Sequence, residues 1–578
     1  MIAAHRVLAS RVRERLFRLS PPRTRDIQVE RDLPITMPDG VILLADRYIG
    51  VGDRTGSDSS GNGGGRSDAV EPPPTVLIRT PYGRTGTWSL LYGPPLAERG
   101  FQVIIQSVRG TAGSGGQFVP RAQERDDGLA TVRWIREQPW FGGRLAGAGM
   151  SYLGYALWSI ADEAGLDAVC LQATMPSLVE PLYDGGAFGL GIALPWTALV
   201  SRAQPILGQL RNRISDKELQ AGLDRLPLAD GDRSTLGRQI GFYQDWLAHG
   251  PDDAYWTAQS HTHRVTSLTS PVSMRTGWYD VYLPWMLRDY AALCAAGNPP
   301  RLTIGPWGHT SAGLLRGIPR ETVDFLGEHL LGTPPRAGGQ VRYHVTGANE
   351  WRDAEVWPPP GGRDHRWSLG AAGALTPIDG DPPEAGAQPD PHPNPAAAEV
   401  PGSASVFRYD PADPTPAVGG PTMLTDETSV DNRALEQRSD VLVFTSLPLL
   451  ADIDVIGTPR VRLTVSSDNR YHDLFVRLCD VHPDGSSMNL GGRLVRLDDV
   501  EPDQVGIREA NLELWPSAHR FAAGHRIRVQ VSGGAHPRYA RNPGTGEPLA
   551  TATRTVVSTV AVHHDGQLTS TITLPVHP

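Results

Sequence analysis

The sequence predicts an α/β fold with a mainly parallel sheet, followed by an all-β domain. In the first half of the chain, short apolar runs such as 76–78 and 103–105 alternate with helix-like segments. Apolar runs without polar alternation suit strands that are covered on both faces, as in a parallel sheet. After Pro358 helix signals fade, and β-branched stretches separated by turn residues indicate an antiparallel sandwich or jelly roll.

A chain of 578 residues can bury more than one core. We expect four segments: the first part of an α/β domain over 1–176, an inserted helical cap over 177–264, the second part of the α/β domain over 265–357, and a C-terminal jelly-roll β-sandwich over 358–578. The cap is expected because the rhythm changes there to helix-like segments with scattered aromatic residues.

The composition excludes several classes of partner. A formal net charge of -9 gives no electrostatic footprint for nucleic acid or an anionic membrane, so neither is expected. The three cysteines are far apart and odd in number, which predicts neither a disulfide framework nor a zinc site. Residues 1–25 lack an apolar run long enough for a secretory signal or a membrane span. We therefore expect a cytoplasmic protein without cofactor or metal, and a homo-oligomer is compatible with the sequence.

Local signals predict several further elements. Residues 29–49 contain two strand-like stretches around Asp39-Gly40, a dipeptide that favours a tight hairpin. Residues 52–74 are rich in Gly, Ser, Asp and Pro and predict a surface loop. A helical pattern over 126–135, with acidic residues at its start, ends before Pro139. A second long loop is expected over 375–401, which is again rich in Pro, Gly, Ala and Asp.

The stretch 147–154 reads as a nucleophile elbow around Ser151. In such an elbow a serine occupies a strained turn between a strand and a helix, and small neighbours let the two elements approach. Gly149 and Gly154 supply that room, although the common form of the motif has glycine where this chain has Leu153. The alternative is an ordinary glycine-rich turn before a buried helix.

Two later strands end in the groups that such a serine needs. The apolar run 272–276 leads into Asp280, and the run 302–304 leads into His309. Functional groups gather at the carboxyl ends of strands in open α/β sheets. A serine hydroxyl requires a base and a third group that orients the base, and the order serine, acid, histidine is that of an α/β-hydrolase. The sequence therefore predicts a catalytic triad.

Several motifs together resemble one family of serine hydrolases. Gly-x-Ser-Tyr-x-Gly at 149–154, Arg-x-Pro-Tyr at 79–82, the blocks 277–280 and 305–309, and Pro-Arg-Tyr near the C-terminus resemble the cocaine esterase, α-amino acid ester hydrolase and X-prolyl dipeptidyl-peptidase family. The resemblance covers nearly the whole chain, and Ser107 departs from the aspartate expected there.

The resemblance implies an oxyanion hole and substrates of a known kind. The hydroxyl of Tyr82 would donate to the oxyanion, with the backbone N–H of Tyr152 as second donor. Family members accept simple esters, amino-acid esters, β-lactam side chains or peptides after proline. Aromatic side chains also line ligand pockets, and the candidates for substrate contact are Tyr183, Phe188, Trp196 and Tyr282.

The sequence therefore predicts a serine hydrolase that cleaves ester or amide bonds of small molecules through an acyl-serine intermediate. One alternative is an X-prolyl dipeptidyl-peptidase-like peptidase, and another is a non-catalytic carbohydrate-binding protein. A metal-dependent hydrolase could recruit His261 and His263, but that pair has no adjacent carboxylate at motif spacing.

Overall fold

The computed structural model describes most of the chain. The described residues are 2–51, 72–202, 215–378, 398–400, 404–423, 428–498, 500–504, 506–564 and 566–578. Most of the loop expected over 52–74 lies outside them. The loop expected over 375–401 is wrong at both ends, because β12 (Leu375–Pro377) pairs with one neighbouring strand and β13 (Ala398–Val400) pairs with another. The part between these two strands lies outside the described residues, apart from Ile378.

The first half of the chain builds a mixed sheet in the order β1-β2-β4-β3-β5-β6-β7-β8-β9-β10. Pairing is parallel from β4 through β9, and antiparallel toward both edges. The α/β fold class is thus confirmed. The strands are β1 (Ile27–Thr36), β2 (Ile42–Gly50), β3 (Thr75–Thr80), β4 (Gln102–Ser107), β5 (Leu145–Met150), β6 (Ala168–Gln172), β7 (Val272–Tyr279), β8 (Arg301–Gly308), β9 (Val341–Val345) and β10 (Glu350–Ala354).

Helices cover both faces of this sheet, which explains the continuous apolar runs in the sequence. Val76 and Ile78 of β3 belong to one core with helices α1, α2 and α11, whereas Leu77 between them belongs to the opposite core with α3 and α10. Every residue of β3, β4 and β5 is consequently buried. The helices are α1 (Ile2–Phe17), α2 (Thr87–Ala97), α3 (Glu124–Arg136), α4 (Tyr152–Trp158), α10 (Leu283–Ala295) and α11 (Ala312–Leu331).

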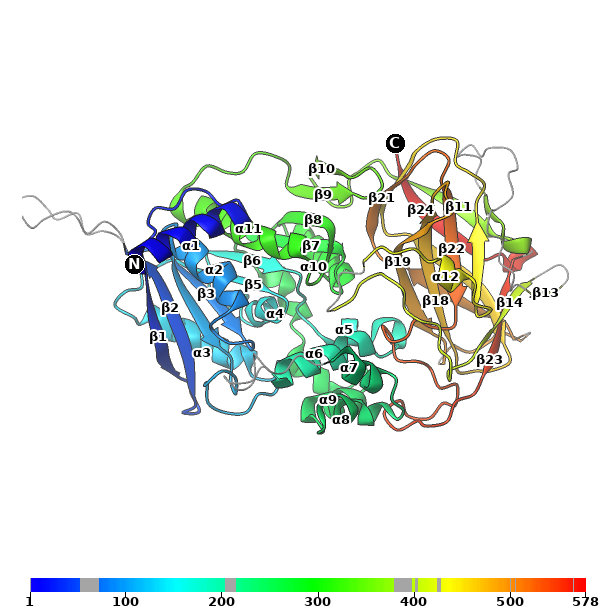
Figure 1. Cartoon of the computed structure of the whole chain (residues 1–578), viewed down its shortest axis with the longest axis horizontal. Coiled ribbons are helices and arrows are strands. Elements are labelled where there is room, and N and C mark those ends of the chain that lie inside the picture. The colour runs from blue at the N-terminus through cyan, green and yellow to red at the C-terminus, as the bar shows by residue number, and fades with distance from the viewer. Residues whose placement is uncertain are drawn as a thin grey trace, which may run out of the picture.

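Between β6 and β7 the chain leaves the sheet and forms a group of short helices (Figure 1). Trp196, Tyr243 and Trp246 of this group are buried in the same core as the adjacent face of the sheet, so the cap and the sheet share apolar packing. The cap helices are α5 (Val179–Leu182), α6 (Leu190–Arg202), α7 (Asp216–Leu223), α8 (Gly231–Leu236) and α9 (Gly241–Ala248).

The C-terminal part is an antiparallel β-sandwich, drawn in yellow to red in Figure 1. Its two sheets share one core, to which β11, β17 and β24 of the larger sheet and β15, β18 and β22 of the smaller sheet contribute. The remaining elements are β11 (Arg363–Leu369), β14 (Ala404–Tyr409), α12 (Arg433–Glu436), β15 (Val441–Thr445), β16 (Ile453–Gly457), β17 (Arg460–Ser467), β18 (Asp473–Val481), β19 (Ser487–Arg496), β20 (Arg508–Glu513), β21 (Ser517–Phe521), β22 (Arg526–Ser532), β23 (Ser558–His563) and β24 (Thr571–His577).

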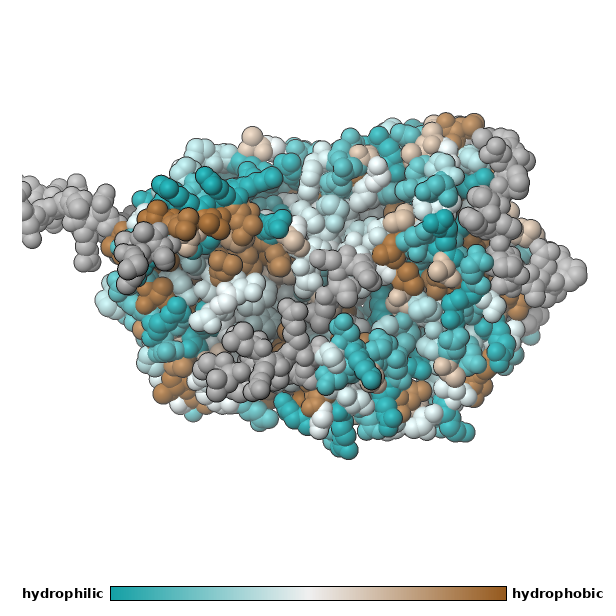
Figure 2. Space-filling view, viewed as in Figure 1, coloured by the Kyte–Doolittle hydropathy of each residue, from teal (hydrophilic) through white to brown (hydrophobic). Residues whose placement is uncertain are grey.

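The N-terminal helix α1 lies on the surface of the hydrolase domain. Its side chains Leu8, Val12 and Leu16 are exposed, and Figure 2 shows apolar surface where this helix lies. Phe17 and Leu19 at its end are buried and anchor the helix to the core. Within the described part of the chain, no helix has the length and apolar character required to cross a bilayer.

Candidate active site

Ser151 occupies the sharp turn between β5 and α4. Its backbone has φ 56 and ψ -123, which is a strained conformation for a residue other than glycine. The surrounding structure holds this turn, because the Ser151 N–H donates to the carbonyl of Gln172 at 2.9 Å and Thr174 Oγ1 donates to the Ser151 carbonyl at 2.7 Å. The turn is therefore a nucleophile elbow in its backbone geometry as well as in sequence.

The two glycines of the motif are explained by close contacts. A Cβ atom on Gly149 would lie 2.4 Å from the backbone carbon of Leu153, and one on Gly154 would lie 2.6 Å from Thr174 Cγ2. Both distances are far below van der Waals contact. The strand therefore requires glycine at 149 and the helix requires it at 154, whereas the side chain at 153 points into an apolar core.

The structure brings Ser151, His309 and Asp280 together, although they come from three different strand ends. Nε2 of His309 lies 3.1 Å from Ser151 Oγ, and Nδ1 of His309 lies 3.3 Å from Asp280 Oδ1. All three side chains are buried. This arrangement places a base on the serine and an acid behind the base, as serine acyl transfer requires.

Asp280 is held by its own turn. Its Oδ1 also accepts the backbone N–H of Tyr282 at 2.9 Å, and Oδ2 is buried without a hydrogen-bond partner among the described residues. The ring of Tyr282 packs edge-on against the imidazole of His309, with ring centroids 5.2 Å apart. The turn after β7 thus fixes both the acid and the orientation of the histidine.

Tyr82, the oxyanion donor predicted from the family resemblance, lies beside the elbow. Its hydroxyl accepts the indole N–H of Trp196 at 2.9 Å and lies close to Ser151. Burial raises the pKa of Tyr82, against the effect of the Trp196 hydrogen bond, so the phenol keeps its proton at neutral pH. The backbone N–H of Tyr152 is at the first position of helix α4 and has no acceptor within that helix. Two groups able to donate hydrogen bonds therefore lie near Ser151.

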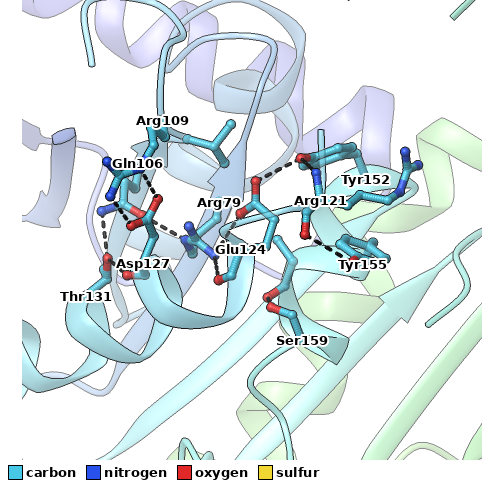
Figure 3. A network of polar contacts seen from close by, with 12 residues as sticks. Arg79, Gln106, Arg109, Arg121, Glu124, Asp127, Thr131, Tyr152, Tyr155 and Ser159 are labelled. Carbon is cyan, nitrogen blue, oxygen red and sulfur yellow. Dashed lines mark hydrogen bonds and ion pairs between the residues drawn. The ribbon is translucent and has the colours of Figure 1, made fainter. Parts of the chain in front are cut away.

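The hydroxyl of Tyr152 is held by a buried ion pair between Glu124 and Arg79 (Figure 3). Its hydroxyl donates to Glu124 Oε1 at 2.8 Å, while Glu124 Oε2 lies 2.9 Å from Nη1 of Arg79. Burial raises the pKa of Glu124, and the Arg79 charge and the Tyr152 hydrogen bond oppose that shift. The network connects β3, α3 and α4 beneath the elbow, which positions the residue that follows the nucleophile.

The four aromatic candidates for substrate contact divide into two pairs. Trp196 stacks on Tyr152 with ring centroids 5.9 Å apart, and Trp196 and Tyr282 line a narrow gap beside the triad. Phe188 is fully buried, and Tyr183 donates its hydroxyl to the backbone carbonyl of Trp246 at 2.7 Å. The structure places this second pair in the packing of the cap and not along that gap.

Two residues beside the site were not singled out from the sequence. Trp88 stacks on Tyr82 with ring centroids 5.5 Å apart. Arg121 is buried, and its guanidinium lies 5.1 Å from the ring of Tyr152 and 5.2 Å from that of Trp196. An arginine after a Phe-Val-Pro stretch carries no local signal of burial, so only the packing of the cap identifies it.

A larger cavity of about 390 Å³ lies where the cap, the hydrolase domain and the sandwich meet. Trp285, Trp515 and Arg538 are among its lining residues, and Ile192 lines both this cavity and the narrow gap beside the triad. A cavity of this size suits a small organic ligand. The fold therefore offers room for a small ligand in a cavity that adjoins the narrow gap through Ile192.

Groups that could bind a metal lie away from the triad. Ligand atoms of Asp480, His482 and His525 in the sandwich lie within 4.8 Å of one another. The pair proposed from the sequence does not form such a group among the described residues: His261 is buried with Nε2 3.2 Å from the Tyr155 hydroxyl, whereas His263 is exposed. Burial lowers the pKa of His261 to about 4, which keeps that imidazole neutral.

The sheet order, the elbow after β5 and the groups at the ends of β7 and β8 define an α/β-hydrolase. Residues 67–311 match the model of the X-Pro dipeptidyl-peptidase (S15 family), and residues 337–573 match that of the X-Pro dipeptidyl-peptidase C-terminal non-catalytic domain. The chain belongs to the cocaine esterase, α-amino acid ester hydrolase and X-prolyl dipeptidyl-peptidase family of serine α/β-hydrolases.

Relatives extend over almost the full length of the chain. Cocaine esterase from Rhodococcus sp. (strain MB1 Bresler) is 30% identical over 598 residues, which cover 95% of this chain and 98% of that protein. A Mycobacterium bovis protein named as a serine esterase is 25% identical over 94% of each chain. The family membership makes this protein a serine hydrolase of ester or amide bonds.

Solved structures share the fold at lower identity. An aminopeptidase from a marine sediment Thaumarchaeota archaeon superposes with a TM-score of 0.75 at 23% identity, covering 96% of this chain and 97% of that one. An α-amino acid ester hydrolase also gives a TM-score of 0.75, at 22% identity, covering 96% of this chain and 98% of that one. These likenesses support the arrangement of hydrolase domain, cap and sandwich as a whole.

Proposed function

We propose that Ser151 is the nucleophile of an esterase for small molecules, with His309 as general base and Asp280 as the group that orients it. The observation that carries this proposal is the distance of 3.1 Å between Ser151 Oγ and His309 Nε2. A neutral imidazole at this distance can take the hydroxyl proton as the oxygen attacks the substrate carbonyl.

The remaining steps follow from the donors around the elbow. Attack forms a tetrahedral intermediate whose oxyanion accepts from the Tyr82 hydroxyl and the Tyr152 N–H. His309 then gives its proton to the leaving oxygen, which departs as an alcohol and leaves the acyl group on Ser151. Water attacks this acyl-serine with His309 again as base, and the acid product and free serine are released.

The charge beside the triad favours an ester over a peptide with a free amino terminus. A dipeptidyl-peptidase has to hold a substrate ammonium group, for which a carboxylate is the natural partner. Among the described residues that line the narrow gap, Arg121 is the only charged one, and its charge repels an ammonium group. The carboxylates Asp184 and Asp216 line the larger cavity, which adjoins this gap at Ile192. The family model named for X-Pro dipeptidyl-peptidase keeps the peptidase as the second candidate.

Replacement of the nucleophile tests the proposal. Ser151→Ala should lower kcat for a 4-nitrophenyl ester by a factor on the order of 10⁴ or more, with the thermal transition retained. Ser159→Ala is the matched control, because this buried serine donates only to the carbonyl of Ala156 within the same helix. An organophosphonate should label Ser151 stoichiometrically. Residual activity within about tenfold of wild type, or labelling at another residue, would contradict the assignment.

Two further assignments belong to the same proposal. Cys170, Cys294 and Cys479 are all free thiols, which supports a location in the reducing cytoplasm. The shared core of the two C-terminal sheets supports a jelly roll. Fractionation of cells that produce the protein tests the first assignment, and an experimental structure tests the second.

A further inference from the structure

Arg121 is a buried cation whose side chain makes no hydrogen bond or ion pair within the described part of the chain. The residue is 3% exposed, and its Nε and Nη1 atoms are buried without hydrogen-bond partners among the described residues. No carboxylate of the described chain forms an ion pair with it. Glu124, the acid near this position, is engaged by Arg79 and by the Tyr152 hydroxyl. Burial of an unpaired charge is costly, typically by several kcal/mol.

Aromatic rings surround the guanidinium but leave its N–H groups unsatisfied. The central carbon lies 5.1 Å from the rings of Tyr152 and Tyr155 and 5.2 Å from that of Trp196. Figure 3 shows the guanidinium beside the two tyrosines, with no dashed line leading to it. Cation–π attraction recovers part of the lost hydration, but it uses no N–H donor. The adjoining gap has no room for a water molecule, so solvent there cannot take the protons.

The position of Arg121 connects it to the reacting groups. The gap that it lines is also lined by Trp196, which donates to Tyr82, and by Tyr282, which packs on His309. The other lining residues are apolar: Leu178, Leu182, Ile192 and Trp246. In this structure the gap is closed, and once its walls separate, apolar side chains around one unpaired guanidinium would suit an aliphatic or aromatic stem that ends in an anion.

We propose that Arg121 binds a carboxylate of the ester substrate, located a few bonds from the scissile carbonyl. This inference rests on the proposed esterase function and specifies its substrate class. The guanidinium offers forks of two parallel N–H groups, a geometry that matches a carboxylate, and each fork contains one of the two nitrogens that lack an acceptor. The carboxylate can belong to the acyl group or to the leaving alcohol. Because the gap is narrow, binding requires its side-chain walls to move apart.

Pairs of esters, one with and one without a carboxylate, test this proposal. The first pair is mono-4-nitrophenyl glutarate and 4-nitrophenyl valerate, which have the same leaving group. The second pair is 4-acetoxybenzoate and phenyl acetate, which have the same acyl group. For each pair, the quantity measured is kcat/KM for the anionic ester divided by kcat/KM for the neutral ester. In one of the two pairs this ratio should be about 10- to 100-fold lower in Arg121→Met than in wild type, which is the loss typical of a hydrogen bond to a charged group. The pair that responds identifies the part of the substrate that carries the carboxylate.

The ratio of kcat/KM values distinguishes a failure of this inference from a failure of the proposed esterase function. Effects of a variant on stability or on the triad act on both esters of a pair and cancel. Arg121→Lys provides a second variant, and it should recover only part of the ratio because an ammonium lacks the planar fork. Arg125→Met is the control for loss of a positive charge nearby, since Arg125 is paired with Asp162. Ratios unchanged by Arg121→Met in both pairs would overturn the inference, whereas absence of hydrolysis of all four esters would overturn the esterase proposal.

Discussion

The indole N–H of Trp196 donates to the hydroxyl oxygen of Tyr82 at 2.9 Å. An indole nitrogen can only donate, so the phenolic oxygen is the acceptor in this bond and its own proton remains available. That proton can point toward Ser151, to which the Tyr82 hydroxyl lies close. A residue of the cap thus orients a hydroxyl that belongs to the hydrolase domain, and that hydroxyl is the proposed oxyanion donor.

Removal of this hydroxyl should lower the rate of catalysis far more than it lowers stability. Tyr82→Phe is expected to lower kcat by roughly 10²- to 10³-fold, the cost of losing one oxyanion donor, with little change in KM. The ring still stacks on Trp88, but the buried Trp196 N–H loses its acceptor, so the stability should fall by about 1 kcal/mol, as in a structural tyrosine. Steady-state kinetics and a thermal melt check both parts.

Tyr243→Phe is the matched control for the Tyr82 variant. Tyr243 is also buried in the core, but its hydroxyl donates to the carbonyl of Leu228 within the cap. We expect this variant to lose stability by about 1 kcal/mol while keeping kcat. If Tyr82→Phe behaves like this control, Tyr82 has no part in the reaction and the oxyanion is left to backbone donors.

Asp280 and His309 should act as one unit. Asp280→Asn and His309→Ala are each expected to lower kcat by a factor on the order of 10⁴, and the double variant should be little worse than either. The reason is that the aspartate contributes only through the histidine, from which it lies 3.3 Å away. Measuring kcat of the three variants at one pH gives the coupling free energy between Asp280 and His309. If the losses in the two single variants add fully in the double variant, the two residues work separately.

Metal removal should leave the reaction intact. The proposed steps use protein donors alone, so dialysis against EDTA is expected to leave kcat unchanged. The metal-ligand geometry at Asp480, His482 and His525 lies in the sandwich and contributes no group to these steps. Activity that falls with EDTA and returns with zinc would contradict the serine mechanism as written.

The buried carboxyl of Asp289 in helix α10 should make the stability of the fold depend on pH. Burial raises the pKa of its carboxyl from 3.8 to about 7, in spite of the opposing charge of Arg288. Between pH 4 and 7 the folded protein therefore binds more protons than the unfolded chain, and this group makes the free energy of unfolding fall as pH rises. Asp289→Asn removes the effect. The melting temperature of this variant minus that of wild type should therefore increase from pH 5 to pH 8. A constant difference across this range would show that the carboxyl is not perturbed.

Local sequence patterns predicted the elements that carry the site. Ser151 was identifiable because an elbow needs small residues at fixed neighbouring positions, and the contacts of Gly149 and Gly154 show why. Asp280 and His309 were identifiable because each follows an apolar run that forms a parallel strand. Tyr82 was found only by resemblance to a family, since a tyrosine after a strand carries no such local signal.

The sequence by itself determined the α/β fold class, the order of the reacting groups and the change to a β-rich domain, because strand and helix periodicities are local properties of the chain. Only the tertiary structure decided which side chains surround those groups. Trp196 reaches Tyr82 across 114 positions of sequence, and Arg121 loses its water when the cap packs over it. Burial and hydrogen-bond partnership depend on segments that meet only after folding, and no spacing along the chain encodes them.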